Sequence, residues 1–188
     1  MAPAAIDVCI APYPALYELD SEGDRIPDPV LGWKLTAESM ENRRKWRENF
    51  FKGAEPLEEL TPFEKYYPQV PWHTPPKMFY GLAVQWHHFV DYAKRHGIEL
   101  KEPDSNDCDR ICYAVMVSIE HMSKLIRAPL EYETPRVEGA DLMIALWSNY
   151  TWLTEELEDE DRDEVISILQ KELGITAKPM WYYDAKTT

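Results

Sequence analysis

The sequence predicts a mostly α-helical fold, a single-domain bundle of about four main helices and one short helix, preceded by a proline-rich extended arm. Apolar residues recur at helical spacing in several long segments, and glycines and Thr-Pro pairs mark where those segments begin and end. Prolines are frequent before residue 33, which excludes a long helix there. We therefore expect an extended arm packed on the body (1–35), a helical bundle (36–175) and an aromatic C-terminal tail (176–188).

The arm is expected to be extended, and its pattern allows one short β-hairpin. Residues 15–19 alternate as the residues of a strand do. Residues 20–24, Asp-Ser-Glu-Gly-Asp, are typical of a turn.

The first helix is expected to begin near Thr36 and to end at Gly53, because glycine readily adopts the left-handed conformation that ends helices. Thr61, Pro62 and Glu64 form a capping-box pattern. This pattern predicts a short helix that ends at Pro68.

Four core helices are expected after this point, over about residues 74–97, 107–127, 139–157 and 161–173. In each segment the apolar side chains fall on one face when residues are spaced by about 100°. The tail that follows holds Trp181, Tyr182 and Tyr183. It is too aromatic to remain in water, so we expect it to pack back onto the body.

The chain carries 34 acidic and 20 basic residues, which gives a formal charge of −14. This charge disfavours binding to nucleic acid and to anionic membranes. No segment reaches the roughly 18 apolar residues of a membrane-spanning helix, and three cysteines do not indicate a secreted disulfide framework. We predict a soluble, cytoplasmic protein that binds neither nucleic acid nor membrane.

The motifs of several common binding and catalytic sites are absent from the sequence. It contains no Gly-x-Gly turn, no Cys-x-x-Cys, no His-Glu-x-x-His and no Gly-x-Ser-x-Gly. We therefore predict no cofactor and no metal ion, and these absences favour binding over catalysis.

Two histidines are the candidates for acid–base chemistry. His87 precedes Asp91 by four residues, so a continuous helix would let the carboxylate orient the imidazole. Glu120 and His121 lie on the next expected helix, and His121 would meet His87 if the two helix edges faced each other. The alternative is that each histidine is an ordinary polar residue at the edge of a core face.

Arg43, Arg44 and Arg47 form a dense basic cluster together with Lys45 and Trp46. Arginine beside an exposed aromatic ring can bind a phosphate or another anion. The alternative, which the acidic composition favours, is that these cations pair with carboxylates of the same chain.

Cys108 and Cys112 lie four residues apart on one helix face, where we expect buried structural thiols. A thiolate metal site would need further ligands, and only Cys9 is left. The acidic run at residues 155–164 lacks the glycine of a calcium loop, so we expect it to be solvated surface.

Trp152 falls opposite the apolar stripe of its expected helix, so either the aromatic tail or a partner should cover it. Our leading hypothesis is a non-enzymatic helical binding or interaction protein. It would present an aromatic-rich surface or groove that includes Trp152, Trp181, Tyr182 and Tyr183. Its partner would be another protein, a second copy of the chain or a small-molecule ligand.

The alternative hypothesis is a small-molecule enzyme with a pocket between helices. His87 or His121 would act there as the general acid or base, assisted by Asp91 or Glu120. A closed polar pocket that contains two of these histidines would favour the enzyme, and a flat aromatic patch would favour binding.

Overall fold

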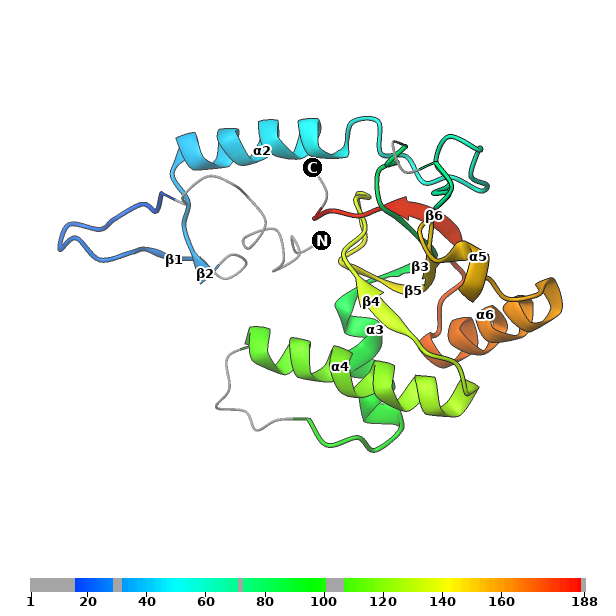
Figure 1. The fold of residues 1–188 in the computed structure, drawn as a ribbon. Helices are drawn as coiled ribbons and strands as arrows, with labels where there is room; N and C mark the ends of the chain where they lie inside the picture. Colours follow the sequence, from blue (N-terminus) through cyan, green and yellow to red (C-terminus); the bar gives the residue numbers. More distant parts are fainter. Residues whose placement is uncertain (1–15, 29–31, 71–72, 101–106, 187–188) are drawn as a thin grey trace. The chain divides into compact units, whose positions relative to one another are not determined.

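The computed structural model describes residues 16–28, 32–70, 73–100 and 107–186. The chain divides into two compact units, residues 1–53 and 54–188. Figure 1 shows the helices and strands of both units in sequence colours. The predicted packing of residues 1–35 on the body stays a prediction.

The first unit contains the turn that the sequence predicts at residues 20–24. Leu19 forms a β-bridge with Arg25, and the Asp20 carboxylate accepts the N–H groups of Glu22 and Asp24, each at 2.9 Å. Strand β1 (Pro27–Asp28) then pairs with β2 (Gly32–Trp33) in an antiparallel ladder. These short pairings make the described part of the arm extended.

Helix α2 (Ala37–Phe51) follows in the same unit, close to its predicted bounds. Thr36 caps its N-terminus because its Oγ1 accepts the Ser39 N–H at 3.2 Å. Gly53 has a φ of 69°, in agreement with its predicted role after the helix.

The second unit is built around a four-stranded antiparallel sheet with the order β4-β5-β3-β6. The strands are β3 (Met78–Val84), β4 (Glu131–Glu133), β5 (Leu142–Ser148) and β6 (Met180–Tyr183). The protein therefore has an α/β fold, and the prediction of a mostly α-helical bundle is wrong.

The helix predicted over residues 74–97 is in fact strand β3 followed by helix α3 (Trp86–Arg95). The apolar residues of β3 fit a helical stripe because the strand is buried on both faces and needs no alternation. Gly81 was the local signal against a helix, since it marks a close approach between strands. A Cβ atom at Gly81 would overlap the main-chain oxygen of Ile144 in β5.

The helix predicted over residues 139–157 is likewise wrong. Its first half is strand β5, and only the short helix α5 (Trp152–Glu155) follows it. Six of the seven β5 residues are buried, so the strand is a continuous apolar run that periodicity cannot distinguish from a buried helix.

The aromatic tail packs onto the body, as predicted, but as part of the sheet. Strand β6 pairs with β3, and its outer edge is bridged by Leu57, which exchanges two main-chain hydrogen bonds with Trp181 at 2.8 and 2.9 Å. Main-chain pairing thus holds the tail in place, in addition to its aromatic packing.

Helices α4 (Asp107–Ile126) and α6 (Asp159–Leu173) confirm two predicted helices. Gly174 ends α6 with a φ of 66°. Helices α3, α4 and α6 contact one another and form the helical layer of this unit (Figure 1). The prediction of a short helix after Thr61 is wrong. The Thr61 N–H does donate to Glu64 Oε2 at 2.7 Å, as in a capping box, but the segment that follows forms only a turn.

The sheet carries a hydrophobic cluster on each face. Met78, Trp147, Trp181 and Leu60 form one cluster. Phe79, Met143, Ala145 and Tyr182 form the other. Successive strand residues point to opposite faces, so neighbours such as Met78 and Phe79 belong to different clusters.

We expect Gly81→Ala to destabilise the protein by about 3 kcal/mol or more, because the added methyl group would meet main-chain atoms that cannot move without separating β3 from β5. The free energy of unfolding in urea measures this effect. Gly97→Ala is the control, since Gly97 has a φ of 62° and open space around it, and it should cost only about 1–2 kcal/mol. Equal losses of unfolding free energy in the two variants would show that a side chain at position 81 does not force β3 and β5 apart.

Candidate functional site

A groove of about 420 Å³ lies beside the C-terminal half of β5 in the second unit. Its apolar walls are formed by Phe79, Ala128, Pro129, Ala145, Leu146, Trp147 and Leu157. Small-molecule sites in proteins typically have volumes of roughly 300–1,000 Å³ and mostly apolar walls. The groove therefore has the size and lining of a site for a small organic molecule.

The groove exists because β4 is shorter than β5. Pairing between these strands begins with Glu131 opposite Ala145, so the segment before Glu131 does not follow the rest of β5. At the same point β5 contains a β-bulge, since the next pair along β3 and β5 skips Leu146. Residues 128–129 and helix α5 form the walls on either side of this open strand end.

Three charged side chains, Lys77, Glu131 and Glu155, line the groove. The Lys77 ammonium lies 4.5 Å from the centroid of the Phe79 ring, whose negative face attracts a cation. Within the part of the chain that the structure describes, no ion pair joins any of these three groups to another charge. Their charges are therefore available to a ligand.

The hydroxyl groups of Ser148 and Thr151 also line the groove, but they stabilise the turn after β5. Thr151 Oγ1 accepts the Ser148 N–H at 3.0 Å. Ser148 Oγ in turn accepts the N–H groups of Tyr150 and Thr151 at 3.3 and 3.2 Å. These bonds fix the shape of the wall.

Trp147 is 3% exposed and stacks on Tyr80 with 4.7 Å between the ring centroids. Its indole N–H has no hydrogen-bond partner among the described residues. A buried donor left unpaired costs about 1–3 kcal/mol. The fold therefore leaves one buried donor unsatisfied in a residue that also lines the groove.

Asn149 holds the end of β5 in place and is fully buried. Its side-chain Oδ1 accepts the Met78 N–H at 2.9 Å, and its Nδ2 donates to the main-chain oxygens of Glu64 and Pro76 at 2.7 and 2.8 Å. Its own main-chain N–H donates to the Met78 oxygen at 2.9 Å. One side chain therefore joins the end of β5 to the start of β3 and to the preceding loop.

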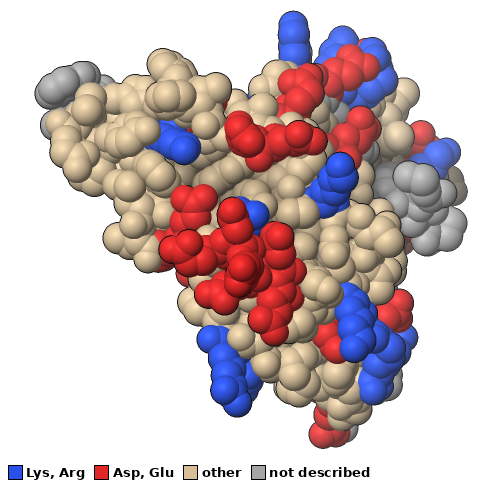
Figure 2. Space-filling model, turned by 90° about the vertical axis from the view of Figure 1, so that its right-hand side faces the viewer, with Lys and Arg blue, Asp and Glu red and all other residues tan. Residues whose placement is uncertain are grey.

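Acidic side chains are dense next to the groove. Exposed carboxylates continue from Glu155 through the first turn of α6, which holds Asp159, Glu160 and Asp161. Figure 2 views the side on which α5 and α6 lie and shows a dense group of acidic side chains there. The electrostatic potential at this side of the groove is therefore negative.

His87 and Asp91 are both exposed on α3 and do not form the predicted pair. The His87 ring packs on His88 with 4.1 Å between centroids, and the Asp91 carboxylate lies 4.0 Å from the Lys94 ammonium. No hydrogen bond joins His87 to Asp91 among the residues that the structure describes. His88 caps the helix instead, because its Nδ1 accepts the Gln85 N–H at 3.1 Å, and burial lowers the pKa of its imidazole.

His121 lies near His96 rather than His87. Its Nδ1 is 2.6 Å from the Tyr92 hydroxyl, and its ring centroid is 5.2 Å from that of His96. The His96 Nε2 lies 2.8 Å from a Glu172 carboxylate oxygen, so the cluster connects α3, α4 and α6. Burial raises the pKa of Tyr92 to about 12, and its hydroxyl therefore keeps its proton at neutral pH.

Glu120, although adjacent to His121 in the sequence, contacts a different residue. It pairs with the Lys124 ammonium at 2.6 Å, and this bond lowers the pKa of its carboxyl group. None of the four residues proposed for acid–base chemistry lines the groove.

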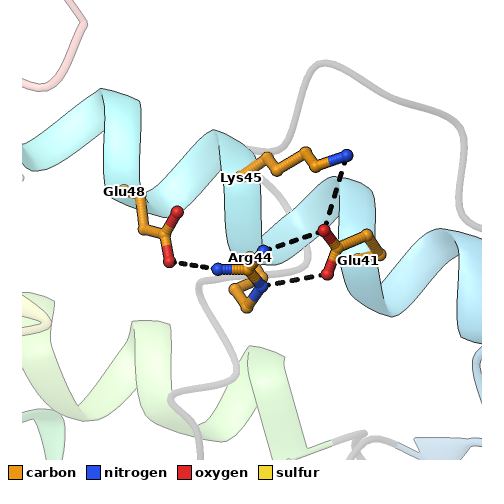
Figure 3. A network of polar contacts seen from close by, with 4 residues as sticks. All are labelled: Glu41, Arg44, Lys45 and Glu48. Atoms are coloured by element: carbon orange, nitrogen blue, oxygen red, sulfur yellow. Dashed lines mark hydrogen bonds and ion pairs between the residues drawn. The ribbon is translucent and has the colours of Figure 1, made fainter.

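Two cations of the basic cluster on α2, Arg44 and Lys45, pair with carboxylates of their own helix. Figure 3 shows Arg44 between Glu41 and Glu48, with N–O distances of 2.8 and 2.5 Å, and Lys45 at 3.4 Å from Glu41. Hydrogen bonds from Arg44 lower the pKa of Glu41 to about 2. This arrangement matches the alternative in which the cations pair within the chain.

The other two arginines of the basic cluster and the three cysteines remain to be placed. Arg43 is half-buried on α2, and the side chain of Arg47 lies outside the described residues. The Cys9 residue and the Cys108 side chain also lie outside them. Cys112 is exposed, so the expectation that it is buried is wrong.

The four aromatic residues proposed as a binding surface are mainly internal. Trp152 is half-buried, packs against the cluster that contains Trp181, and donates its indole N–H to the Tyr66 oxygen at 3.2 Å. Trp181 and Tyr182 are 6% and 5% exposed, and Tyr183 is half-buried. Of the two ways in which Trp152 was expected to be covered, the structure shows the first, since the tail residue Trp181 belongs to the cluster on which Trp152 packs.

In residues 16–28, 32–70, 73–100 and 107–186, no group of three or more His, Cys, Asp or Glu side chains is arranged to hold a metal ion. No helix in those ranges has both the length and the apolar character needed to cross a membrane. The chain matches no protein-family model, no curated protein and no solved structure. Its function must therefore be argued from its own geometry.

The groove residues could not be identified from the sequence. Lys77 follows two prolines, Glu131 belongs to a segment expected to connect helices, and Glu155 was interpreted as part of a solvated acidic run. The one usable signal was the continuous apolar run that ends at Ser148, which is typical of a central strand as well as of a helix.

We expect Asn149→Ala to destabilise the protein by about 2–4 kcal/mol, because it leaves the buried Met78 N–H without an acceptor and removes the donor to the main-chain oxygens of Glu64 and Pro76. Thermal or urea unfolding measures the loss. Asn49→Ala, at an exposed position of α2, should change stability by no more than about 0.5 kcal/mol. A small effect of Asn149→Ala would mean that water replaces the amide.

We expect Arg44→Met to raise the pKa of Glu41 from about 2 toward its ordinary value of 4.5, as followed by NMR titration of the carboxyl carbon. Because the pKa is lower in the folded state, the pairing stabilises the protein above pH 4.5, and this contribution disappears as the pH falls toward 2. Lys124→Met is the control and should leave Glu41 unchanged. A Glu41 pKa that does not respond to Arg44→Met contradicts the pairing.

Proposed function

We propose that this chain is a non-enzymatic binding protein for a small organic ligand and that the groove beside β5 is its ligand site. The observation that supports this most is the combination of apolar walls with three charged groups that have no ion-pair partner among the described residues. Ligand sites combine an apolar lining with a few polar groups that orient the ligand.

Binding is favoured over catalysis because the described residues that line the groove include no histidine or cysteine. The enzymatic alternative now depends on His121, which has Tyr92 as its hydrogen-bond partner in place of Asp91 or Glu120. That pair lies where α3 meets α4, away from the groove lining. It stays a second proposal, and the experiment below distinguishes it from the first.

We expect Ala128→Trp to weaken ligand binding at least about tenfold, since the half-buried Ala128 lines the groove and an indole there would occupy the ligand's space. Ligand-observed NMR with a library of small apolar acids, amines and zwitterions identifies the ligands. Two-dimensional spectra then locate the residues that respond to each ligand.

The matched control is Ala177→Trp, a half-buried alanine outside the groove lining, which should bind as the wild type does. Thermal melting establishes that both variants are folded. Binding that is unaffected by Ala128→Trp, or no binding by any compound, overturns the proposal. Ligand-induced shifts at Tyr92 and His121 without shifts in the groove would replace it with the enzymatic alternative.

A further inference from the structure

The charged groups around the groove include both signs, and each belongs to a different element of the fold. Lys77 lies at the start of β3, Glu131 at the start of β4 and Glu155 in α5. We propose that the groove binds a small apolar zwitterion, a molecule with an apolar body, a carboxylate and an ammonium group, of which free hydrophobic amino acids are the simplest class. This inference rests on the proposed function and assigns the chemical class of its ligand.

Lys77 is the group that would bind the carboxylate. It is half-buried in a chain with 34 acidic residues, yet its ammonium contacts the Phe79 ring and has no carboxylate partner among the described residues. Two other lysines of the same unit pair with carboxylates, Lys124 with Glu120 at 2.6 Å and Lys186 with Glu133 at 2.7 Å, whereas Lys65, like Lys77, lies over an aromatic ring. A ligand carboxylate would therefore complete an interaction that the fold leaves open.

Glu131 and Glu155 are the groups that would attract the ammonium. Both are exposed at the rim, and neither forms an ion pair within the described part of the chain. The acidic start of α6 continues from Glu155 and makes the potential there negative (Figure 2). A purely anionic ligand would meet repulsion from this side.

The apolar walls of the groove favour a ligand with an apolar body. Phe79, Leu146, Trp147 and Leu157 present aromatic and aliphatic surface between the charged groups. An apolar body removes that surface from water, which favours binding. An apolar amine would leave Lys77 without a partner, an apolar acid would face two carboxylates, and a zwitterion satisfies both signs.

The test compares three ligands that share one apolar body and differ in their charged groups, phenylalanine, phenylalanine amide and N-acetylphenylalanine, by calorimetric or NMR titration of the full chain. Phenylalanine should bind at least about tenfold tighter than either derivative, because each derivative lacks one charge-assisted contact. The corresponding leucine series shows whether an aliphatic body suffices.

Variants assign each charge to its group. Lys77→Met keeps the aliphatic contact with Phe79 and should abolish the preference for phenylalanine over the amide. Glu131→Gln combined with Glu155→Gln should abolish the preference over the N-acetyl derivative. Lys178→Met changes an exposed lysine outside the groove lining and should preserve both preferences.

Equal binding of the three ligands, or preferences that persist in the charge variants, overturns the zwitterion inference. If neither amino acid series binds while other library ligands are still blocked by Ala128→Trp, the ligand class is wrong and the groove remains the site. If Ala128→Trp blocks nothing, the proposed function fails as well. The two failures are therefore distinguishable.

Discussion

The buried amide of Asn149 is the contact on which the second unit depends. It is fully buried and joins the end of β5 to Met78 at the start of β3 and to the loop that contains Glu64 and Pro76. A buried amide cannot exchange these partners for water, so the chain segments that it joins keep one arrangement. The turn that begins at Asn149 carries Thr151 and α5, and the same amide thereby sets one wall of the groove.

The close approach of β3 and β5 at Gly81 gives the sheet its compact centre, and the bulge at Leu146 changes the course of β5 immediately beyond it. Strand β4 begins to pair only at Ala145, so the bulged part of β5 is left beside an open space. Bulges often occur beside functional sites because they redirect side chains. Here the bulge and the short neighbouring strand together produce the groove.

Several charged groups on the helices have partners within the chain. Arg44 is shared by two glutamates on α2, and Glu172 of α6 contacts His96 in the cluster that connects α3, α4 and α6. Lys77 and the two glutamates of the groove differ from this pattern because they line an open apolar space without pairing. The combination of both signs of charge with apolar walls, rather than any sequence motif, marks the groove as the candidate site.

The sequence by itself determined the features that depend on neighbouring residues: the turn at residues 20–24, the Thr36 cap of α2, helices α4 and α6, and the Gly174 stop. Their deciding contacts span only a few residues. Strands β3 and β5 are apolar on both faces, so their patterns are compatible with either a helix or a strand, and pairs such as Leu82 with Ile144 decide between them. The groove depends on the same long-range contacts, because Lys77, Glu131 and Glu155 come together only after the sheet has formed. Local hydrogen bonds can be recognised in a sequence, whereas pairing between distant segments depends on the free energy of the whole fold.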